Sequence, residues 1–345
     1  MTIESARSCR VVVVTGASAG VGRAAVREFA KRGARIGLIA RGREGLEAAR
    51  ADVEAVGGEA LIVPADVADA NGMQQAAAAV EAAFGPIDVW VNNATTSVLS
   101  PVSQMTPAEY RRVTEVTYLG VVYGTLAALE RMRALDRGVI VQVGCALMER
   151  GIPGQSAYCG AKQAIQGFTD CLRRELRQEG SGVRVTMVQL PALNTPQLAW
   201  VKSRLRHRAR PIPPVFQPEV AARAIVWAAE HDRRAVYVGL STVLTVLGRR
   251  IVPWLSEHDR VGTARATSDT NELEDAHRPD NLWKPAPGDH GARGRFGARA
   301  IDHGWEPWTT PDRRWVAGVV AGIVGVLYAL FTRRRSAGKE QRRAA

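Results

Sequence analysis

The chain alternates between short runs of β-branched residues and longer, alanine-rich stretches with helical periodicity. Most of the short runs are continuously apolar, as in strands that helices cover on both faces of a parallel sheet. Seven candidate strands cover residues 10–15, 35–40, 60–64, 89–92, 138–143, 184–189 and 235–238, and six candidate helices cover 20–32, 43–56, 71–84, 107–133, 156–179 and 218–231. This alternation predicts right-handed crossovers and an α/β fold with a doubly wound parallel sheet of about seven strands.

The composition changes after about residue 252. Residues 254–312 are rich in Pro, Gly, Asp, His and Arg and show no sustained period, which predicts a loose linker or a segment draped over the domain. Residues 315–331 then carry no charge. We therefore predict four parts, namely an α/β domain over 1–252, an irregular linker over 253–314, an apolar helix over 315–331 and a basic tail over 332–345.

The apolar segment 315–331 has the minimum length for a helix that spans a membrane. Gly318 and Gly322 would permit close helix contact in lipid, and basic residues flank the segment. Because the segment follows a polar linker and has no evident core to join, we expect membrane association rather than a docking helix. Its topology stays open, and an interfacial arrangement is one solution. Without an apolar signal peptide at the N-terminus, the folded domain is expected in the cytoplasm.

The formal net charge of +12 is scattered through the helices and concentrated again near the C-terminus. No nucleic-acid-binding module or aromatic-interleaved basic stripe accompanies it, so we expect no nucleic-acid partner. The four cysteines show neither metal spacing nor a paired pattern, and the six histidines are dispersed. The sequence therefore predicts reduced thiols and no metal site.

A glycine-rich turn joins the first strand to the first helix. Glycines allow a tight turn and close approach of the backbone to a pyrophosphate, which the N–H groups and dipole of the helix N-terminus can bind. An ordinary βα turn is the alternative, but the strand before and the helix after favour a nucleotide site. We expect the nucleotide to contact Gly16, Ser18, Gly20, Val21 and Gly22.

The second strand ends at Arg41, and Arg43 lies just beyond it. An acidic residue there would bind the ribose hydroxyls of NAD, whereas a guanidinium suits the 2′-phosphate of NADP. The alternative is that these arginines are merely solvated at the end of a strand. We therefore expect NADP(H) as the cofactor, with Arg41 as the phosphate ligand.

Tyr158 and Lys162 lie four residues apart at the start of a candidate helix, so they share one face of it. An ammonium beside a phenol stabilises the phenolate and lowers the pKa of the tyrosine. Such a pair can serve as a general acid and base.

Together these motifs resemble the short-chain dehydrogenase/reductase family over residues 9–252. The matching residues are Thr15, Gly16, Gly20 and Gly22 in the turn, Asp66 and Val67 after the third strand, Asn92, Asn93 and Ala94 after the fourth, Tyr158 and Lys162, and Pro191 and Thr195 after the sixth. The resemblance implies a Rossmann-type fold in which Asp66 and Val67 contact adenine and Thr195 lies near the nicotinamide amide. It also implies that Asn93 adjoins the cofactor, and that the long helices pair in a dimer or tetramer.

The resemblance further implies the chemistry. Tyr158 would protonate a carbonyl oxygen as hydride leaves the nicotinamide, or deprotonate an alcohol in reverse, while Lys162 would bind the nicotinamide ribose. Two departures from the family pattern bear on this chemistry: Cys145 stands where a serine hydrogen-bonds the substrate, and Thr117 where an asparagine supports a proton relay. In addition, Thr95 replaces the glycine that follows Ala94 in the family. A thiol is a weaker donor than a hydroxyl. Cys145 as a nucleophile is an alternative to a small substitute for serine.

The loops at the carboxyl ends of the strands are rich in apolar residues, which predicts a hydrophobic substrate. The residues are Val98, Leu99, Val102, Leu147, Met148, Ile152, Leu193, Leu198 and Trp200. We therefore expect an NADP(H)-dependent oxidoreductase that interconverts an alcohol and a ketone or aldehyde. The alternative is a catalytically weakened, membrane-attached protein that binds NADP as a sensor or scaffold.

Overall fold

The structure is a computed structural model that describes residues 10–146, 151–251, 272–275 and 277–303. The chain divides into two compact units, Met1–Trp308 and Thr309–Ala345, and every described residue belongs to the first. The apolar segment predicted over 315–331 lies outside the described residues. Within the described part of the chain, no helix combines the length and the apolar character that crossing a membrane requires.

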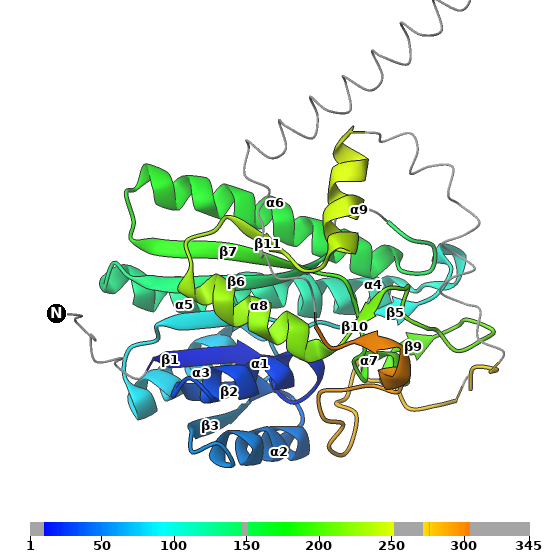
Figure 1. Ribbon diagram of the computed structural model, residues 1–345, viewed down its shortest axis with the longest axis horizontal. Helices are drawn as coiled ribbons and strands as arrows, with labels where there is room; N and C mark the ends of the chain where they lie inside the picture. Colours follow the sequence, from blue (N-terminus) through cyan, green and yellow to red (C-terminus); the bar gives the residue numbers. More distant parts are fainter. Residues whose placement is uncertain (1–9, 147–150, 252–271, 276, 304–345) are drawn as a thin grey trace, which may run out of the picture. The chain divides into compact units, whose positions relative to one another are not determined.

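A seven-stranded sheet with parallel pairing forms the centre of the first unit (Figure 1). Its strand order is β11-β7-β6-β4-β1-β2-β3. Because β1 lies between β2 and β4, the chain winds outward in opposite directions from this point, where doubly wound sheets bind ligands. The prediction of a doubly wound parallel sheet is confirmed. The strands are β1 (Val11–Thr15), β2 (Arg35–Ala40), β3 (Glu59–Pro64), β4 (Val89–Asn92), β6 (Gly138–Cys145), β7 (Val183–Leu190) and β11 (Ala235–Tyr237).

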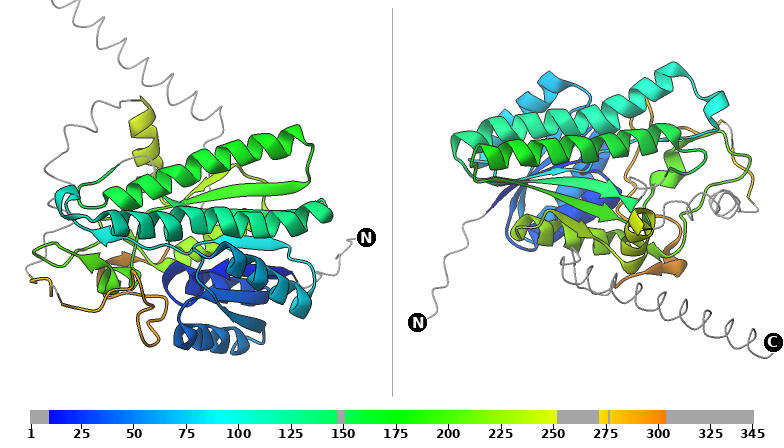
Figure 2. Two further views of the ribbon diagram at one scale, coloured as in Figure 1. Left: turned by 180° about the vertical axis from the view of Figure 1, so that it is seen from behind. Right: turned by 90° about the horizontal axis from the view of Figure 1, so that it is seen from above.

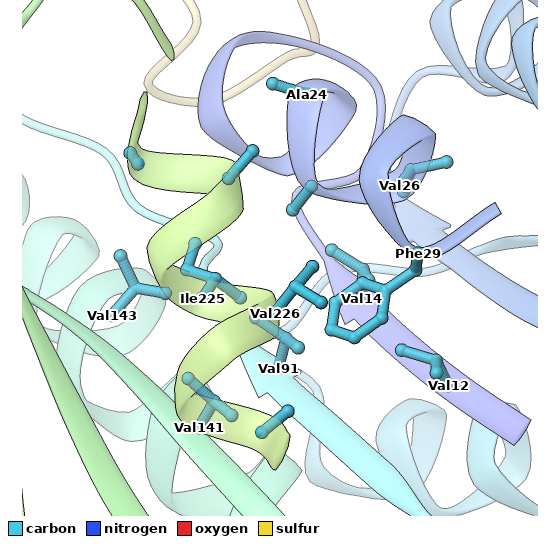
Figure 3. Packing of buried hydrophobic residues seen from close by; sticks show 14 of the residues in the cluster. Val12, Val14, Ala24, Val26, Phe29, Val91, Val141, Val143, Ile225 and Val226 are labelled. Atoms are coloured by element: carbon cyan, nitrogen blue, oxygen red, sulfur yellow. The ribbon is translucent and has the colours of Figure 1, made fainter. Parts of the chain in front are cut away.

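Helices cover both faces of this sheet (Figure 2). On one face lie α1 (Gly20–Ala30), α2 (Arg43–Glu54) and α8 (Pro218–Glu230), and on the other lie α3 (Ala70–Phe84), α5 (Gly120–Ala134) and α6 (Ser156–Gln178). Alternate residues of β1 point to opposite faces, so Val12 and Val14 pack under the first group, as Figure 3 shows with Phe29 and Val226. Fully apolar strands are the consequence of burial on both faces.

The predicted helix over 107–133 is divided in the structure. It comprises α4 (Pro107–Thr114), a π-helical turn (Glu115–Leu119) and α5. The Thr106 side chain caps α4 by accepting a hydrogen bond from the main-chain N–H of Glu109, whose carboxylate accepts from the Thr106 N–H in return. Thr117 lies in the π-helical turn, a kind of irregularity found often at functional sites.

Short elements extend the carboxyl edge of the sheet. They are β5 (Val98–Leu99), β8 (Ala192–Leu193), α7 (Gln197–Trp200), β9 (Lys202–Ser203), β10 (Val215–Phe216), α9 (Leu240–Ile251) and β12 (Ala300–Ile301). The strand β10 pairs in parallel with β8 and with β12. We call residues 277–303 the strap; β12 at its far end joins it to the domain. The sequence did not predict α9 or any of the short strands.

Candidate active site

The glycine turn that follows β1 is tightly packed. Gly16 has a φ of +69°, in the left-handed region that favours glycine. A Cβ on Gly22 would clash with the carbonyl oxygen of Gly16 and with the side chain of Asn93. The turn therefore needs glycine at both positions. It brings the positive end of the α1 dipole to the carboxyl edge of the sheet, where an anion is stabilised.

The loop after β4 supports this turn. Asn93 Nδ2 donates to the carbonyl oxygen of Thr15 at 3.0 Å, and the N–H groups of Asn93 and Ala94 donate to Thr15 Oγ1 at 3.0 and 3.1 Å. Thr15 Oγ1 in turn donates to the carbonyl oxygen of Val91. Asn93 is thus a brace between two strand ends, as well as a residue that lines the cleft beside the turn.

This cleft has a volume of about 200 Å³. Nine residues predicted to contact the cofactor line it, namely Gly16, Ser18, Gly20, Val21, Arg41, Asp66, Val67, Asn93 and Thr195. Of the other two, Gly22 packs behind the turn, and Lys162 lines a neighbouring cavity. These features fit a phosphorylated dinucleotide. The helix N-terminus and the guanidinium at the end of β2 complement its negative charges, and the glycine turn, which tolerates no added Cβ, lets its phosphates approach the backbone.

The guanidinium of Arg41 lies where the sequence predicts it, at the end of β2, but it contacts the strap. Its Nη2 donates to the carbonyl oxygen of Asn281 at 2.5 Å, and its Nη1 donates to that of Trp283 at 3.1 Å. Burial lowers the pKa of Arg41, and the nearby carboxylate of Asp66 opposes that shift. Arg43 is different, because its side chain is 74% exposed and pairs with Glu47.

A second cavity, of about 490 Å³, continues from the first. The two share the lining residues Val21, Asn93, Thr95, Thr195 and Gln197. Tyr158, Lys162 and Cys145 all line the second cavity. The structure therefore brings the candidate catalytic side chains to the end of a space that begins at the glycine turn.

Tyr158 and Lys162 lie on one face of α6, as their spacing predicts. The ammonium of Lys162 is 5.7 Å from the centroid of the Tyr158 ring and donates to the carbonyl oxygen of Val143 at 2.8 Å. Burial lowers the pKa of Lys162 to about 8. The predicted lowering of the Tyr158 pKa is not found: burial raises that pKa well above 10, and the neighbouring Cys145 raises it further. Desolvation of the phenolate outweighs the distant ammonium.

The side chain of Cys145 lies within hydrogen-bonding contact of Tyr158, at the end of β6. Thr117 lies deeper and is fully buried. Its hydroxyl donates to the carbonyl oxygen of Thr96 at 2.9 Å and accepts from the N–H of Thr96 at 3.1 Å. Its oxygen is also 3.2 Å from the hydroxyl of Thr95, which stands where the family has glycine. Two departures from the family pattern are therefore hydrogen-bonded to each other.

The lining of the second cavity is largely apolar. Of the residues predicted for the substrate pocket, Leu99, Ile152, Leu193 and Leu198 line it. Three others do not: Val98 packs in the core, Val102 is 65% exposed, and Trp200 lines the cofactor cleft, while Leu147 and Met148 lie outside the described residues.

The basic stretch 202–210 is partly neutralised within the chain. Lys202 and Arg204 pair with the carboxylate of Glu109 at 3.2 and 2.7 Å, and Arg208 lies 3.5 Å from that of Glu272. Burial alone would raise the pKa of Glu109, but hydrogen bonds from Arg204, from the Thr106 N–H and from Lys202 stabilise the carboxylate and lower this pKa to about 2. Much of this stretch therefore fixes the loop above the cavity.

Comparison with known proteins decides the family. A model of the short chain dehydrogenases matches residues 10–205, which is more than half of the chain. This chain belongs to the short-chain dehydrogenase family. An uncharacterized oxidoreductase of Bacillus subtilis, YxnA, is 31% identical over 91% of this chain and 89% of its own. A fatty acyl-CoA reductase of Acinetobacter baylyi is 30% identical over 69% of this chain and 78% of its own.

Solved structures agree with the fold. A metagenomic short-chain oxidoreductase in complex with NADP matches with a TM-score of 0.56 and 29% identity, over 66% of this chain and 96% of its own. An alcohol dehydrogenase from Thermococcus sibiricus matches with a TM-score of 0.59 and 23% identity, over 67% and 96%, which supports the fold alone. About a third of this short-chain dehydrogenase therefore lies outside the part shared with either structure.

Several residues of the two cavities were not predicted from the sequence. The strap supplies Asn281, Pro285, Ala286, Gly288 and His290 to the cofactor cleft, and α9 supplies Ser241, Thr242 and Thr245 to the second cavity. Neither segment carries a family motif. A possible signal for the strap was its density of turn-forming residues without disorder-like repeats, but this signal does not say where such a segment docks.

Proposed function

We propose that this short-chain dehydrogenase is an NADP(H)-dependent oxidoreductase that interconverts an alcohol and a ketone or aldehyde on a hydrophobic substrate. The supporting observation is that Tyr158, Lys162 and Cys145 line a cavity continuous with the cleft at the glycine turn. A cavity of about 490 Å³ lies within the range of small-molecule sites.

In the reducing direction, Tyr158 transfers its hydroxyl proton to the carbonyl oxygen. A nicotinamide dinucleotide held at the glycine turn would supply the hydride for the carbonyl carbon. The raised pKa of Tyr158 keeps the phenol protonated at neutral pH, as a proton donor must be. Lys162 holds a positive charge 5.7 Å from the centroid of the Tyr158 ring, and the carbonyl oxygen of Val143 orients the ammonium.

The choice of NADP rests on Arg41, because it places a guanidinium at the end of β2 where a ribose 2′-phosphate is bound in this kind of fold. One solved relative contains NADP, which agrees with this choice. The hydrophobic substrate is supported by the apolar lining and by the resemblance to a fatty acyl-CoA reductase. Membrane association through residues 315–331 and pairing through the long helices remain part of the proposal.

The deciding experiment is Tyr158→Phe, which removes the proton donor and keeps the ring. We expect kcat to fall by at least about 100-fold, the usual contribution of a positioned acid, while NADP binding is retained. Tyr123→Phe is the matched control, because Tyr123 packs against the core of α3 and α5 and lines neither cavity. Unchanged turnover in Tyr158→Phe would show that Tyr158 is not the general acid or base.

A second candidate function is supported by Cys145. A thiol in contact with Tyr158 replaces the hydroxyl that would donate to the substrate oxygen, and the loss of one such donor costs about 100-fold or more in rate. The protein would then bind NADP as a membrane-attached sensor or scaffold and turn over slowly.

A further inference from the structure

The strap borders the cofactor cleft. Its residues Asn281, Pro285, Ala286, Gly288 and His290 line the cleft together with the glycine turn. Figure 1 shows the strap in orange and gold beside α7 and the end of α1 that the turn precedes. Part of the wall of the cofactor cleft therefore comes from outside the segment that matches the family model.

One end of this stretch is held by two arginines and a buried leucine. Arg41 donates to the carbonyl oxygens of residues 281–283, and Arg112 Nε donates to that of Leu282 at 3.0 Å. Arg112 also pairs with Asp66, the residue predicted to contact adenine. The Leu282 side chain is fully buried and packs with Val113 of α4 and with Ala157 and Ala161 of α6. This anchor thus adjoins the helix that carries Tyr158.

The other end is held at the glycine turn. The N–H of Gly20 donates to the carbonyl oxygen of Gly291 at 3.0 Å, and the buried Arg23 pairs with Asp289 at 3.0 Å. Further along, the N–H of Gly294 donates to the carbonyl oxygen of Asn194 at 3.0 Å. A Cβ on Gly294 would clash with the main chain of Thr195, so the strap lies directly on this loop.

Between these two ends, the strap passes the β2–α2 corner, where we predict that the adenosine ribose binds. A Cβ on Gly42 would lie 3.2 Å from the Cβ of Pro285, so strap and β2–α2 corner are in close contact. A guanidinium has five N–H donors. Arg41 makes three hydrogen bonds to the strap through Nη1 and Nη2, and donors remain for a phosphate oxygen. Arg41 is therefore able to hold the strap and an anion at once.

We propose that residues 281–291 belong to the cofactor site, where they form its outer wall at the adenosine end, and that Arg41 and Leu282 position this wall. This proposal rests on the function proposed above, because the ligand of the wall is NADP(H). Adenosine bound beneath the strap stabilises the closed strap, and the adenosine end leaves only when the strap lifts. The strap also contacts α7, which supplies Leu198 to the second cavity, since the N–H of Asn281 donates to the carbonyl oxygen of Trp200 at 3.0 Å.

The test is hydrogen exchange of the full-length chain, followed by mass spectrometry of the peptide that covers the wall. In the closed strap the amides of Asn281 and Gly288 donate hydrogen bonds to Trp200 and Glu44, which lie outside the strap. A ligand that binds only the closed strap, at 100 times its Kd, slows exchange through opening by about 100-fold. We expect this protection from NADP and from adenosine 2′,5′-bisphosphate, which represents the adenosine end, but not from nicotinamide mononucleotide.

A pair of leucine variants adds a kinetic readout. Leu282→Ala removes the buried anchor, and we expect NADP to dissociate at least about tenfold faster, because a truncated core leucine weakens its contacts strongly. Leu273→Ala makes the same change where the side chain is 68% exposed and outside the wall, and its dissociation rate should match the unmodified protein.

The outcomes separate this proposal from the function it builds on. If NADP binds and supports turnover while the exchange of residues 281–291 is unchanged, the wall is wrong and the proposed function stands. Equal dissociation rates for Leu282→Ala and Leu273→Ala would likewise overturn the wall. If no nicotinamide dinucleotide binds to the unmodified protein, the proposed function itself fails.

Discussion

Arg41 Nη2 lies 2.5 Å from the main-chain carbonyl oxygen of Asn281, a residue 240 positions further along the chain. The arginine predicted to bind a phosphate therefore also holds a distant segment in place. Substitution of Arg41 would remove the predicted phosphate ligand and an anchor of the strap together, so a change in NADP affinity would combine the two effects. Leu282→Ala changes the anchor of the strap and leaves Arg41 in place, so this variant measures the contribution of the strap alone.

The glycine turn makes a prediction that needs no substrate. In Gly22→Ala, the new Cβ would clash with the carbonyl oxygen of Gly16, so the turn must widen. We expect NADP affinity to fall by tenfold or more and the free energy of unfolding to fall by about 1–3 kcal/mol, the usual cost of overpacking. Titration of cofactor fluorescence and urea denaturation measure the two quantities.

Gly167→Ala is the matched control for this change. Gly167 lies in α6, and its Cβ would have nothing within 4 Å. Alanine is a better helix former than glycine, so this variant should gain up to about 1 kcal/mol and bind NADP as before. Equal affinities for the two variants would show that the turn is not the dinucleotide site.

Lys162 makes the stability depend on pH. Burial lowers its pKa from 10.5 to about 8 in the folded protein, so below pH 8 both states are protonated and the cost of burying the ammonium is complete. Between pH 8 and 10.5 the folded state has released a proton that the unfolded state keeps, and the stability of the native protein therefore rises relative to Lys162→Met. Over this range the difference in unfolding free energy between the two proteins should change by about 3 kcal/mol.

Urea denaturation of both proteins at pH 7 and near pH 10 gives this difference. The control is Lys31→Met, whose side chain in the native protein is 57% exposed, and its difference from the native protein should stay nearly flat over the range. A flat difference for Lys162→Met as well would contradict a buried ammonium. A gain in stability at pH 7 on removing Lys162 would be consistent with a residue kept for function.

Cys145→Ser restores a hydroxyl donor beside Tyr158. If the thiol only weakens contact with the substrate oxygen, kcat should rise by at least about tenfold, with the affinity for NADP unchanged. Steady-state rates with a hydrophobic aldehyde or ketone measure the change, and Cys171→Ser, at an exposed position, is the control. Retained cofactor binding with no gain in rate would favour the sensor or scaffold function.

The apolar segment 315–331 makes a prediction about location. The full-length chain should sediment with membranes, and a chain that lacks residues 315–345 should remain in the supernatant and keep its NADP affinity. Flotation on a density gradient distinguishes lipid binding from aggregation. A full-length chain found entirely in the supernatant would remove the proposal of membrane association.

The central fold was predictable because its signals are local. The sheet strands are short apolar runs between turn residues, and the structure moves none of their predicted boundaries by more than two residues. The glycine turn and the Tyr158–Lys162 spacing are also local patterns, so their placement followed. The π-helical turn at Thr117 was not predictable, because periodicity over 107–133 does not show one extra residue in a turn.

The remaining differences arise from long-range packing. The burial of Tyr158 depends on elements that are distant in sequence. The spacing of Tyr158 and Lys162, considered alone, therefore predicted the wrong direction for the shift in the pKa of Tyr158. The strap has no period of its own, and single anchors such as Leu282 give it a fixed course. Its contacts with Arg41 and Gly20 join residues that no sequence pattern links.

The bond between Gly20 and Gly291 also bears on the order in which the protein is made. The nucleotide motif leaves the ribosome before its partner in the strap, which follows about 270 residues later; at 5–20 residues per second this is a delay of roughly 14–54 seconds. During that interval every family motif has been synthesised, yet the outer wall does not exist. A nascent chain of this protein would therefore be expected to hold its cofactor loosely, and to retain it only once synthesis has passed residue 291.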